Sequence, residues 1–169
     1  MTTSIPVVVA GALGRMGAEV IKAVVGATDC TLVGAVDNTP GKEGCDVGLE
    51  LGLGELEVAI TADFEGCLCA VSQSARDAQA GAVLVDFTHP SVVYEHTRAA
   101  IAYGVHPVIG TTGLSPEQLS DLTQFSAKAS IGGAVIPNFS VGMVLLQQAA
   151  AAAARFYDHA ELTELHHNR

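Results

Sequence analysis

The chain is poor in positive charge. Its 169 residues include 8 lysines and arginines against 18 aspartates and glutamates, for a net charge of -10, and the basic residues form no block. Proteins that bind nucleic acid or anionic membranes do so mainly through clustered positive charge. We therefore expect neither partner, and a small anionic ligand would need local cationic or main-chain amide contacts.

Long apolar runs are also missing. No stretch reaches the length of a membrane-spanning helix, about 18 apolar residues, and residues 1–6 do not resemble a secretory signal. We expect a cytoplasmic protein with no membrane partner. Hydrophobic residues make up 49% of the chain and charged residues 15%, which excludes disorder and provides enough apolar material for a core covered on two faces.

Metal-binding and hydrolytic signatures are absent as well. Cys67 and Cys69 form a C-x-C pair, but no second pair or suitably spaced histidine completes a zinc site. We expect no metal, and we expect Cys30, Cys45 and this pair to be reduced thiols. The chain has no G-x-S-x-G motif for a nucleophilic serine and no evident pair of catalytic carboxylates.

The most informative segment is residues 7–17, with the sequence V-V-V-A-G-A-L-G-R-M-G. A β-branched strand stops at Gly11 and a helix begins near Gly14. Glycine allows a sharp turn at Gly11, close approach of a diphosphate to the backbone at Gly14, and close packing of the helix on the strand at Gly17. Amides of the first helical turn bind anions, and Arg15 adds a positive charge.

The context of this G-x-x-G-x-x-G triplet favours a dinucleotide site. A second strand over 31–36 ends at Asp37, about 20 residues past Gly17, where a carboxylate meets the ribose hydroxyls of an adenine nucleotide. The alternative is a βαβ unit whose glycine turn binds nothing.

Strands and helices alternate along the rest of the chain. This pattern predicts an α/β fold, a Rossmann-like, doubly wound and mostly parallel sheet with its strand-to-helix loops on one edge. Besides the segments above, we predict strands over 57–61, 82–87, 106–109, 131–136 and 160–165, a loop over 38–54, helices over 18–26, 91–103, 116–129 and 140–157, and a helical or irregular stretch over 63–80.

Two adjacent histidines, His166 and His167, point to opposite faces if they lie on a strand. Either could transfer a proton near neutral pH, although two histidines at a chain end are also typical of a solvated terminus. The other histidines have no partner at a useful spacing, and we expect structural or surface roles for them. They are His89, His96, His106 and His159.

Five motifs in order, V-A-G-A-L-G-R-M-G, V-D-F-T-H-P, V-I-G-T-T-G, P-N-F-S-V-G and E-L-H-H, span nearly the whole chain. Together they resemble the dihydrodipicolinate reductase family, whose members are 4-hydroxy-tetrahydrodipicolinate reductases. The resemblance implies reduction of 4-hydroxy-tetrahydrodipicolinate, a cyclic dicarboxylate, to tetrahydrodipicolinate with NADH or NADPH, in lysine and diaminopimelate biosynthesis.

The resemblance also implies roles for individual residues. His166 would donate the proton, and His167 would bind a substrate carboxylate. The implied cofactor-binding residues are Gly11, Gly14, Arg15, Met16, Gly17, Asp37, Phe87, Thr88, Gly110, Thr111, Thr112, Asn138 and Phe139.

The chain departs from the family at its end. Members continue with a lysine, a D-x-P-S-G-T segment and the rest of an α/β domain that builds a homotetramer. We therefore expect residues 1–138 to be a dinucleotide-binding domain and residues 139–169 the start of an incomplete substrate-binding and tetramerisation domain. Such a truncated chain should bind cofactor but turn over weakly or not at all.

Cofactor choice is a second departure. Family members often have a basic residue after the ribose carboxylate, but Asn38 follows Asp37 here. A carboxylate repels a 2′-phosphate, whereas Arg15 or Lys42 could attract it, so we expect a slight preference for NADH with dual use open. Two other functions remain open: a non-catalytic nucleotide-sensing module, and an oxidoreductase of similar layout acting on another carbonyl or imine.

Overall fold

A computed structural model describes residues 4–77, 81–161 and 163. The chain forms two compact units, residues 1–137 and residues 138–169. Each is described by itself.

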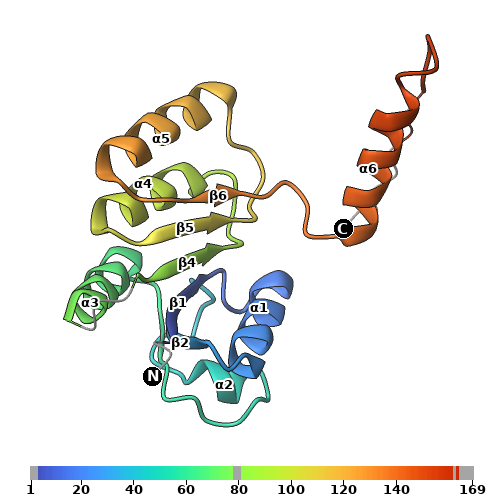
Figure 1. Cartoon of the computed structure of the whole chain (residues 1–169). Coiled ribbons are helices and arrows are strands. Elements are labelled where there is room, and N and C mark those ends of the chain that lie inside the picture. Colours follow the sequence, from blue (N-terminus) through green and yellow to red (C-terminus); the bar gives the residue numbers. More distant parts are fainter. Residues whose placement is uncertain (1–3, 78–80, 162, 164–169) are drawn as a thin grey trace. The chain divides into compact units, whose positions relative to one another are not determined.

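The first unit is built on one sheet of six parallel strands, in the order β3-β2-β1-β4-β5-β6 (Figure 1). This is the strand order of a doubly wound dinucleotide-binding fold, so the predicted Rossmann-like architecture is confirmed. The strands are β1 (Ile5–Ala10), β2 (Cys30–Val36), β3 (Ile60–Thr61), β4 (Val83–Asp86), β5 (His106–Ile109) and β6 (Ala134–Val135).

Helices cover both faces of the sheet. Val7 and Val9 of β1 pack with α1 and α2 in one apolar cluster, whereas Val8 and Ala10 point the other way, toward α3 and α4. Successive side chains of a strand point to opposite faces, so β1 is buried on both. The helices are α1 (Arg15–Gly26), α2 (Val47–Glu50), α3 (Phe64–Asp77), α4 (Val93–Tyr103) and α5 (Pro116–Ala129).

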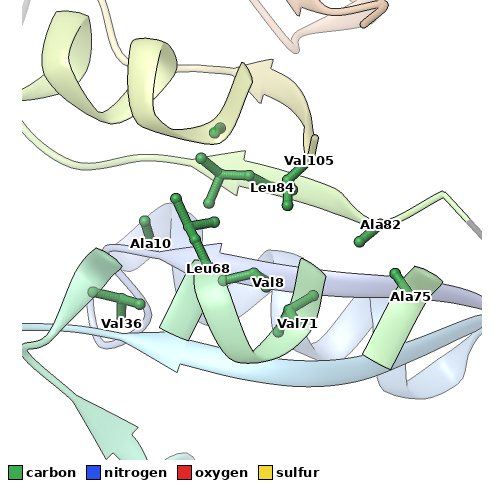
Figure 2. Close-up of a cluster of buried hydrophobic side chains, with 10 residues drawn as sticks. Val8, Ala10, Val36, Leu68, Val71, Ala75, Ala82, Leu84 and Val105 are labelled. Carbon is green, nitrogen blue, oxygen red and sulfur yellow. The ribbon is translucent and has the colours of Figure 1, made fainter. Parts of the chain in front are cut away.

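Figure 2 shows the cluster between α3 and the sheet. Leu68, Val71 and Ala75 of α3 lie over Val8 of β1 and Leu84 of β4. Leu68, Val8 and Leu84 are fully buried. This packing positions the carboxyl ends of β1 and β4 relative to the start of α3, which matters for the site described below.

Local sequence signals set the ends of two helices. Ser115 accepts a hydrogen bond from the amide of Gln118, whose side chain in turn accepts from the Ser115 amide, and Pro116 is the first residue of α5. This capping box satisfies amides that the helix itself leaves without partners. Helix α4 ends at Gly104, which adopts the left-handed conformation with a φ of 77°. Both ends agree with the sequence prediction.

Several predicted boundaries were wrong. The predicted loop over 38–54 contains α2, because Asp46 caps this short helix by accepting from the Leu49 amide. The predicted strands over 57–61 and 131–136 shrink to the two-residue strands β3 and β6. The strand predicted over 82–87, with both faces apolar, is β4, in which side chains are buried alternately and Asp86 is one of the buried ones.

The second unit contains α6 (Val141–Ala153), which is shorter than the predicted helix over 140–157. The helix ends at Ala153, within the alanine run, and Phe156 and Tyr157 lie beyond it. Residues 160, 161 and 163 are not in a strand, and the rest of the strand predicted over 160–165 lies outside the described residues. None of the described helices has the length and apolar character needed to cross a membrane.

Candidate functional site

The turn after β1 requires glycine at its first position. Gly11 has a φ of 76°, and a Cβ there would lie 2.5 Å from the carbonyl oxygen of Phe87. The amides of Gly11 and Ala12 both donate to the carbonyl of Val36, at 2.9 and 3.1 Å. The turn is therefore fixed between the end of β2 and the loop after β4.

Helix α1 packs directly on this turn. A Cβ on Gly17 would overlap the Gly11 carbonyl group, so glycine permits the close approach. The N-cap, Gly14, provides no side-chain hydrogen bond, and the first turn contains no acidic residue. The amides of this turn, at the positive end of the helix dipole, are suited to bind an anion such as a diphosphate. Arg15 and Met16 are exposed in the same turn.

Asp37 follows β2 and connects two loops. Its Oδ2 accepts from the Leu13 amide at 2.8 Å, and its Oδ1 accepts from the amide and hydroxyl of Thr39 at 2.9 and 2.6 Å. A carboxylate has about four acceptor positions, so Oδ2 retains one for a ribose hydroxyl. The two loops joined here are the glycine turn and the turn after β2.

A cavity of about 580 Å³ opens at the carboxyl ends of β1, β2, β3 and β4. This volume lies within the range of small-molecule and cofactor sites, about 300–1,000 Å³. Its lining comes from the glycine turn, the loops after the strands and the first turns of α3 and α4: Gly11, Val36, Asp37, Asn38, Ala62, Phe64, Thr88, His89, Ser91, Val92 and His96.

A fully buried carboxylate, that of Asp86 at the end of β4, connects residues of the cavity lining. Its Oδ1 accepts from the amide and hydroxyl of Thr88 at 2.9 and 2.7 Å and from the Thr111 hydroxyl at 2.7 Å, and its Oδ2 accepts from His96 Nδ1 at 2.9 Å. Burial pushes the pKa of Asp86 upward. The hydrogen bonds from His96, Thr88 and Thr111 outweigh it and hold the pKa below its usual value.

Aromatic side chains form one wall of the cavity. The rings of Phe64 and His96 are stacked, with centroids 3.9 Å apart and an interplanar angle of 17°. His89 accepts at Nδ1 from the Ser91 amide at 3.2 Å, which fixes the proton of the neutral ring on Nε2. A flat apolar wall next to an acceptor for ribose is suited to an adenine ring.

The loop after β5 is tied to Asp86 as well. The amides of Gly110 and Thr111 donate to the Asp86 carbonyl at 2.9 and 3.2 Å. A Cβ on Gly110 would collide with the ring of Phe87, so this ring packs against the glycine. Thr111 is buried and Thr112 is exposed.

The cations that we expected to compete for a 2′-phosphate differ in their surroundings. Lys42 forms an ion pair with Glu50, so it is not a free charge. Arg15 makes no ion pair with any residue that the structure describes. It stands in the first turn of α1, where it adds to the positive end of the helix.

Sequence reasoning missed several residues of the cavity. We expected His89 and His96 to have structural or surface roles, but both line the cavity, and so does Phe64. One signal was present in the sequence: His96 follows Val92, the N-cap of α4, by four residues, a spacing that places two residues on the same side of a helix. Asp86 carried no signal, because it lies within an apolar strand motif.

Four of the predicted site residues are not among the described residues of the first unit. Asn138 and Phe139 belong to the second unit, where Asn138 Oδ1 accepts from the Ser140 amide at 2.7 Å. His166 and His167 lie outside the described residues. Within the described part of the chain, no group of three or more histidine, cysteine or acidic side chains could hold a metal. All four cysteines are free thiols.

The first unit therefore fits an adenine dinucleotide. The fit rests on a glycine turn that side chains would block, an uncapped helix N-terminus, a carboxylate with a spare acceptor position and a cavity with an aromatic wall. These features lie side by side because the carboxyl ends of parallel strands share one edge of the sheet.

Comparison with known families gives one match over most of the chain. The family described as "Dihydrodipicolinate reductase, N-terminus" matches residues 5–139. A 4-hydroxy-tetrahydrodipicolinate reductase of Parasynechococcus marenigrum (strain WH8102) is 93% identical over 168 residues, covering 99% of this chain and 61% of the relative. The protein of the same name from Synechococcus sp. (strain CC9605) is 92% identical, covering 100% of this chain and 61% of the relative. The chain thus spans about three fifths of these curated relatives.

Solved structures show the same fold. A dipicolinate-bound dihydrodipicolinate reductase from Paenisporosarcina sp. TG-14 matches with a TM-score of 0.69 and 29% identity, over 92% of this chain and 55% of that one. The WlbA (WbpB) dehydrogenase from Thermus thermophilus, in complex with NAD and alpha-ketoglutarate, matches with a TM-score of 0.66 and 16% identity, over 88% of this chain and 47% of that one. The second likeness concerns the fold alone.

Proposed function

The chain belongs to the dihydrodipicolinate reductase family, and we propose that it is the part of a 4-hydroxy-tetrahydrodipicolinate reductase that binds NADH or NADPH. The whole enzyme would reduce 4-hydroxy-tetrahydrodipicolinate to tetrahydrodipicolinate in lysine and diaminopimelate biosynthesis. Support comes from the family match and from relatives above 90% identity that bear this name.

One contact carries the proposal. Asp37 Oδ2 accepts from the Leu13 amide at 2.8 Å, and Leu13 lies within the glycine turn that leads into α1. This bond holds the acceptor for a ribose at a fixed place relative to the amides that would bind a diphosphate. An adenine dinucleotide presents these two groups next to each other, so the site is organised before the ligand arrives.

The bound cofactor would supply a hydride from its reduced nicotinamide. The first turn of α1, with Gly14, Arg15 and Gly17, would hold the diphosphate. Asp37 would accept from the adenosine ribose, and Thr88 would border the adenosine. The cofactor-binding roles also extend to Gly11, Met16, Phe87, Gly110, Thr111, Thr112, Asn138 and Phe139.

The reacting end would lie with the later part of the chain. We propose that His166 donates the proton that completes reduction and that His167 binds a carboxylate of the dicarboxylate substrate. In this proposal residues 1–138 are the dinucleotide-binding domain and residues 139–169 begin the domain for substrate and tetramer contacts. The full-length protein would be a cytoplasmic homotetramer.

Titration of nicotinamide fluorescence with this chain tests cofactor binding. We expect saturable NADH binding with a Kd between about 1 µM and 1 mM, the usual range for enzyme ligands, and little or no turnover. The proposal would be contradicted if neither NADH nor NADPH showed saturable binding.

The catalytic part needs the full-length protein. His166→Gln should lower kcat by about 10²-fold or more with an unchanged Kd for NADH, because a general acid contributes about that much. A full-length protein that binds NADH yet shows no reductase activity would instead favour the nucleotide-sensing module.

A further inference from the structure

The loop after the ribose carboxylate is anchored on that carboxylate. Thr39 donates both its amide and its hydroxyl to Asp37 Oδ1, and the Lys42 amide donates to the Thr39 carbonyl at 3.2 Å. Lys42 therefore closes a turn that begins at the group expected to bind ribose. It is the one cationic residue between positions 38 and 75 in the sequence.

Lys42 is held by an acid on a helix. Its Nζ lies 2.5 Å from Glu50 Oε2, and the two side chains are 37% and 25% exposed. Glu50 is the last residue of α2, and Asp46 fixes this helix by accepting from the amides of Leu49, Leu56 and Val58. The hydrogen bond and charge of Glu50 raise the pKa of Lys42. Glu50 thus holds the lysine from a helix whose start is capped by Asp46.

This pairing bears on a phosphate at the ribose. A 2′-phosphate next to Asp37 would face a carboxylate, and the nearest cation along the loop could approach it only by leaving Glu50. Acidic residues also surround the loop in the sequence, at Glu43, Asp46, Glu50, Glu55, Glu57, Asp63 and Glu65. Negative charges that lie near a bound anion oppose its binding.

We propose that Glu50 is a specificity-determining residue that withholds Lys42 from the 2′-position, so that the site selects NADH over NADPH. The inference rests on the proposed function, since it concerns the same cofactor site. Glu50 itself touches no part of the cofactor. It acts through Lys42.

A double-mutant cycle tests the inference, using Glu50→Gln, Lys42→Met, the double variant and wild type. We measure the Kd of NADH and of NADPH by nicotinamide fluorescence, and of 5′-AMP and adenosine 2′,5′-bisphosphate by displacement. Glu50→Gln should tighten NADPH and the bisphosphate about three- to fivefold, the scale of one exposed ion pair. NADH and 5′-AMP should keep their Kd values.

The remaining variants separate Lys42 from a general charge effect. Lys42→Met alone should leave NADH binding unchanged and should not tighten NADPH binding, because the lysine is already occupied by Glu50, and the double variant should return NADPH binding to the wild-type value. Glu19→Gln is the matched control: it removes one negative charge and a comparable pair with Lys22 on the surface of α1, and it should not alter the ratio of the two Kd values.

Three results would overturn the inference: an unchanged ratio in Glu50→Gln, a gain in NADPH affinity that persists in the double variant, or a loss of NADH binding in Glu50→Gln. Failure of the proposed function looks different, because wild type and Glu19→Gln would then bind neither cofactor.

Discussion

His96 Nδ1 donates to the Asp86 carboxylate at 2.9 Å, and this carboxylate has no exposed surface. The same group binds Thr88 and Thr111. One buried charge thus joins the loop after β4, the loop after β5 and helix α4. Thr88, which is proposed to border the adenosine, is thus held by a carboxylate that is itself buried.

Replacing Asp86 should make stability less dependent on pH. The folded pKa of Asp86 lies below the unfolded value, near 3.9, so its stabilisation is complete above that pH and is lost as the pH falls through the folded pKa. Asp86→Asn should destabilise the chain by about 2–4 kcal/mol at neutral pH. When the free energy of unfolding in urea is measured from pH 7 downward, it should fall less steeply with pH in Asp86→Asn than in wild type.

Ser72→Ala is the control for this measurement. Ser72 is also buried and donates to the Tyr103 carbonyl, but it does not ionise. It should lower stability by a similar amount at every pH in the range. An acid limb in Asp86→Asn as steep as that of wild type would contradict the assignment of this titration to Asp86.

Gly17→Ala should disrupt the anion-binding turn. The new Cβ would overlap the Gly11 carbonyl group, so α1 has to shift away from the turn. We expect a loss of about 1–3 kcal/mol in stability, as for other overpacked sites, and at least about tenfold weaker NADH binding, since displaced catalytic or binding groups cost about that much or more. Thermal unfolding and nicotinamide fluorescence measure the two effects.

Gly26→Ala is the comparison on the same helix. No atom lies within 4 Å of a Cβ at Gly26, so this substitution should leave NADH binding unchanged. Equal losses in the two variants would show that the contact with Gly11 is not responsible, because alanine is a better helix former than glycine at both positions.

The sheet and its helices could be predicted because their signals are local. The β-branched run before Gly11, the Ser115-Pro116 start of α5 and Gly104 at the end of α4 each specify conformation over a few residues. Short elements were harder to predict. Strands β3 and β6 have two residues each, so they exist through pairing with a neighbour and not through a pattern of their own.

The cavity was only partly predictable for a related reason. Gly11 and Asp37 stand next to strand ends, where the fold class itself predicts a role. Phe64 and His96 meet only after α3 and α4 pack against each other, and Asp86 gains its partners from three separate elements. Lys42 lies in a loop and its partner Glu50 lies in α2. The composition of this segment predicted a single loop, so it gave no sign of the pairing.

Asp37→Ala should weaken binding of the ribose. It removes the expected acceptor for a ribose hydroxyl and frees the amides of Leu13 and Thr39. We expect about a tenfold increase in the Kd of NADH, equivalent to about 1.4 kcal/mol. The affinity for NADPH should fall less than that for NADH, because the substitution also removes a charge that repels the 2′-phosphate. Fluorescence titration with both cofactors gives the ratio.

Asp121→Ala controls for the loss of a surface carboxylate with two partners. Asp121 accepts from Tyr94 and Arg98, and it does not line the cavity. Its removal should leave both Kd values unchanged. If Asp37→Ala weakened NADPH as much as NADH, the carboxylate would be acting on the loops and not on the ribose.

Phe64→Leu tests the aromatic wall. Leucine keeps most of the apolar volume that packs against the core cluster but cannot stack with His96 or with an adenine ring. Because an aromatic pair contributes about 0.5–1.5 kcal/mol beyond its buried area, the Kd of 5′-AMP should rise about two- to tenfold. Displacement of NADH by 5′-AMP, and by nicotinamide mononucleotide as the other half of the cofactor, measures where the loss falls.

Phe125→Leu is the same substitution at an aromatic residue on α5, where Arg98 lies 4.7 Å from the ring centroid. Phe125 does not line this cavity, so the affinity of the Phe125→Leu variant for 5′-AMP should match that of wild type. Phe64→Leu should raise the Kd of 5′-AMP and leave the Kd of nicotinamide mononucleotide unchanged. If nicotinamide mononucleotide lost as much affinity as 5′-AMP, Phe64 would be supporting the whole site through the start of α3, and the adenine would have to bind against another wall.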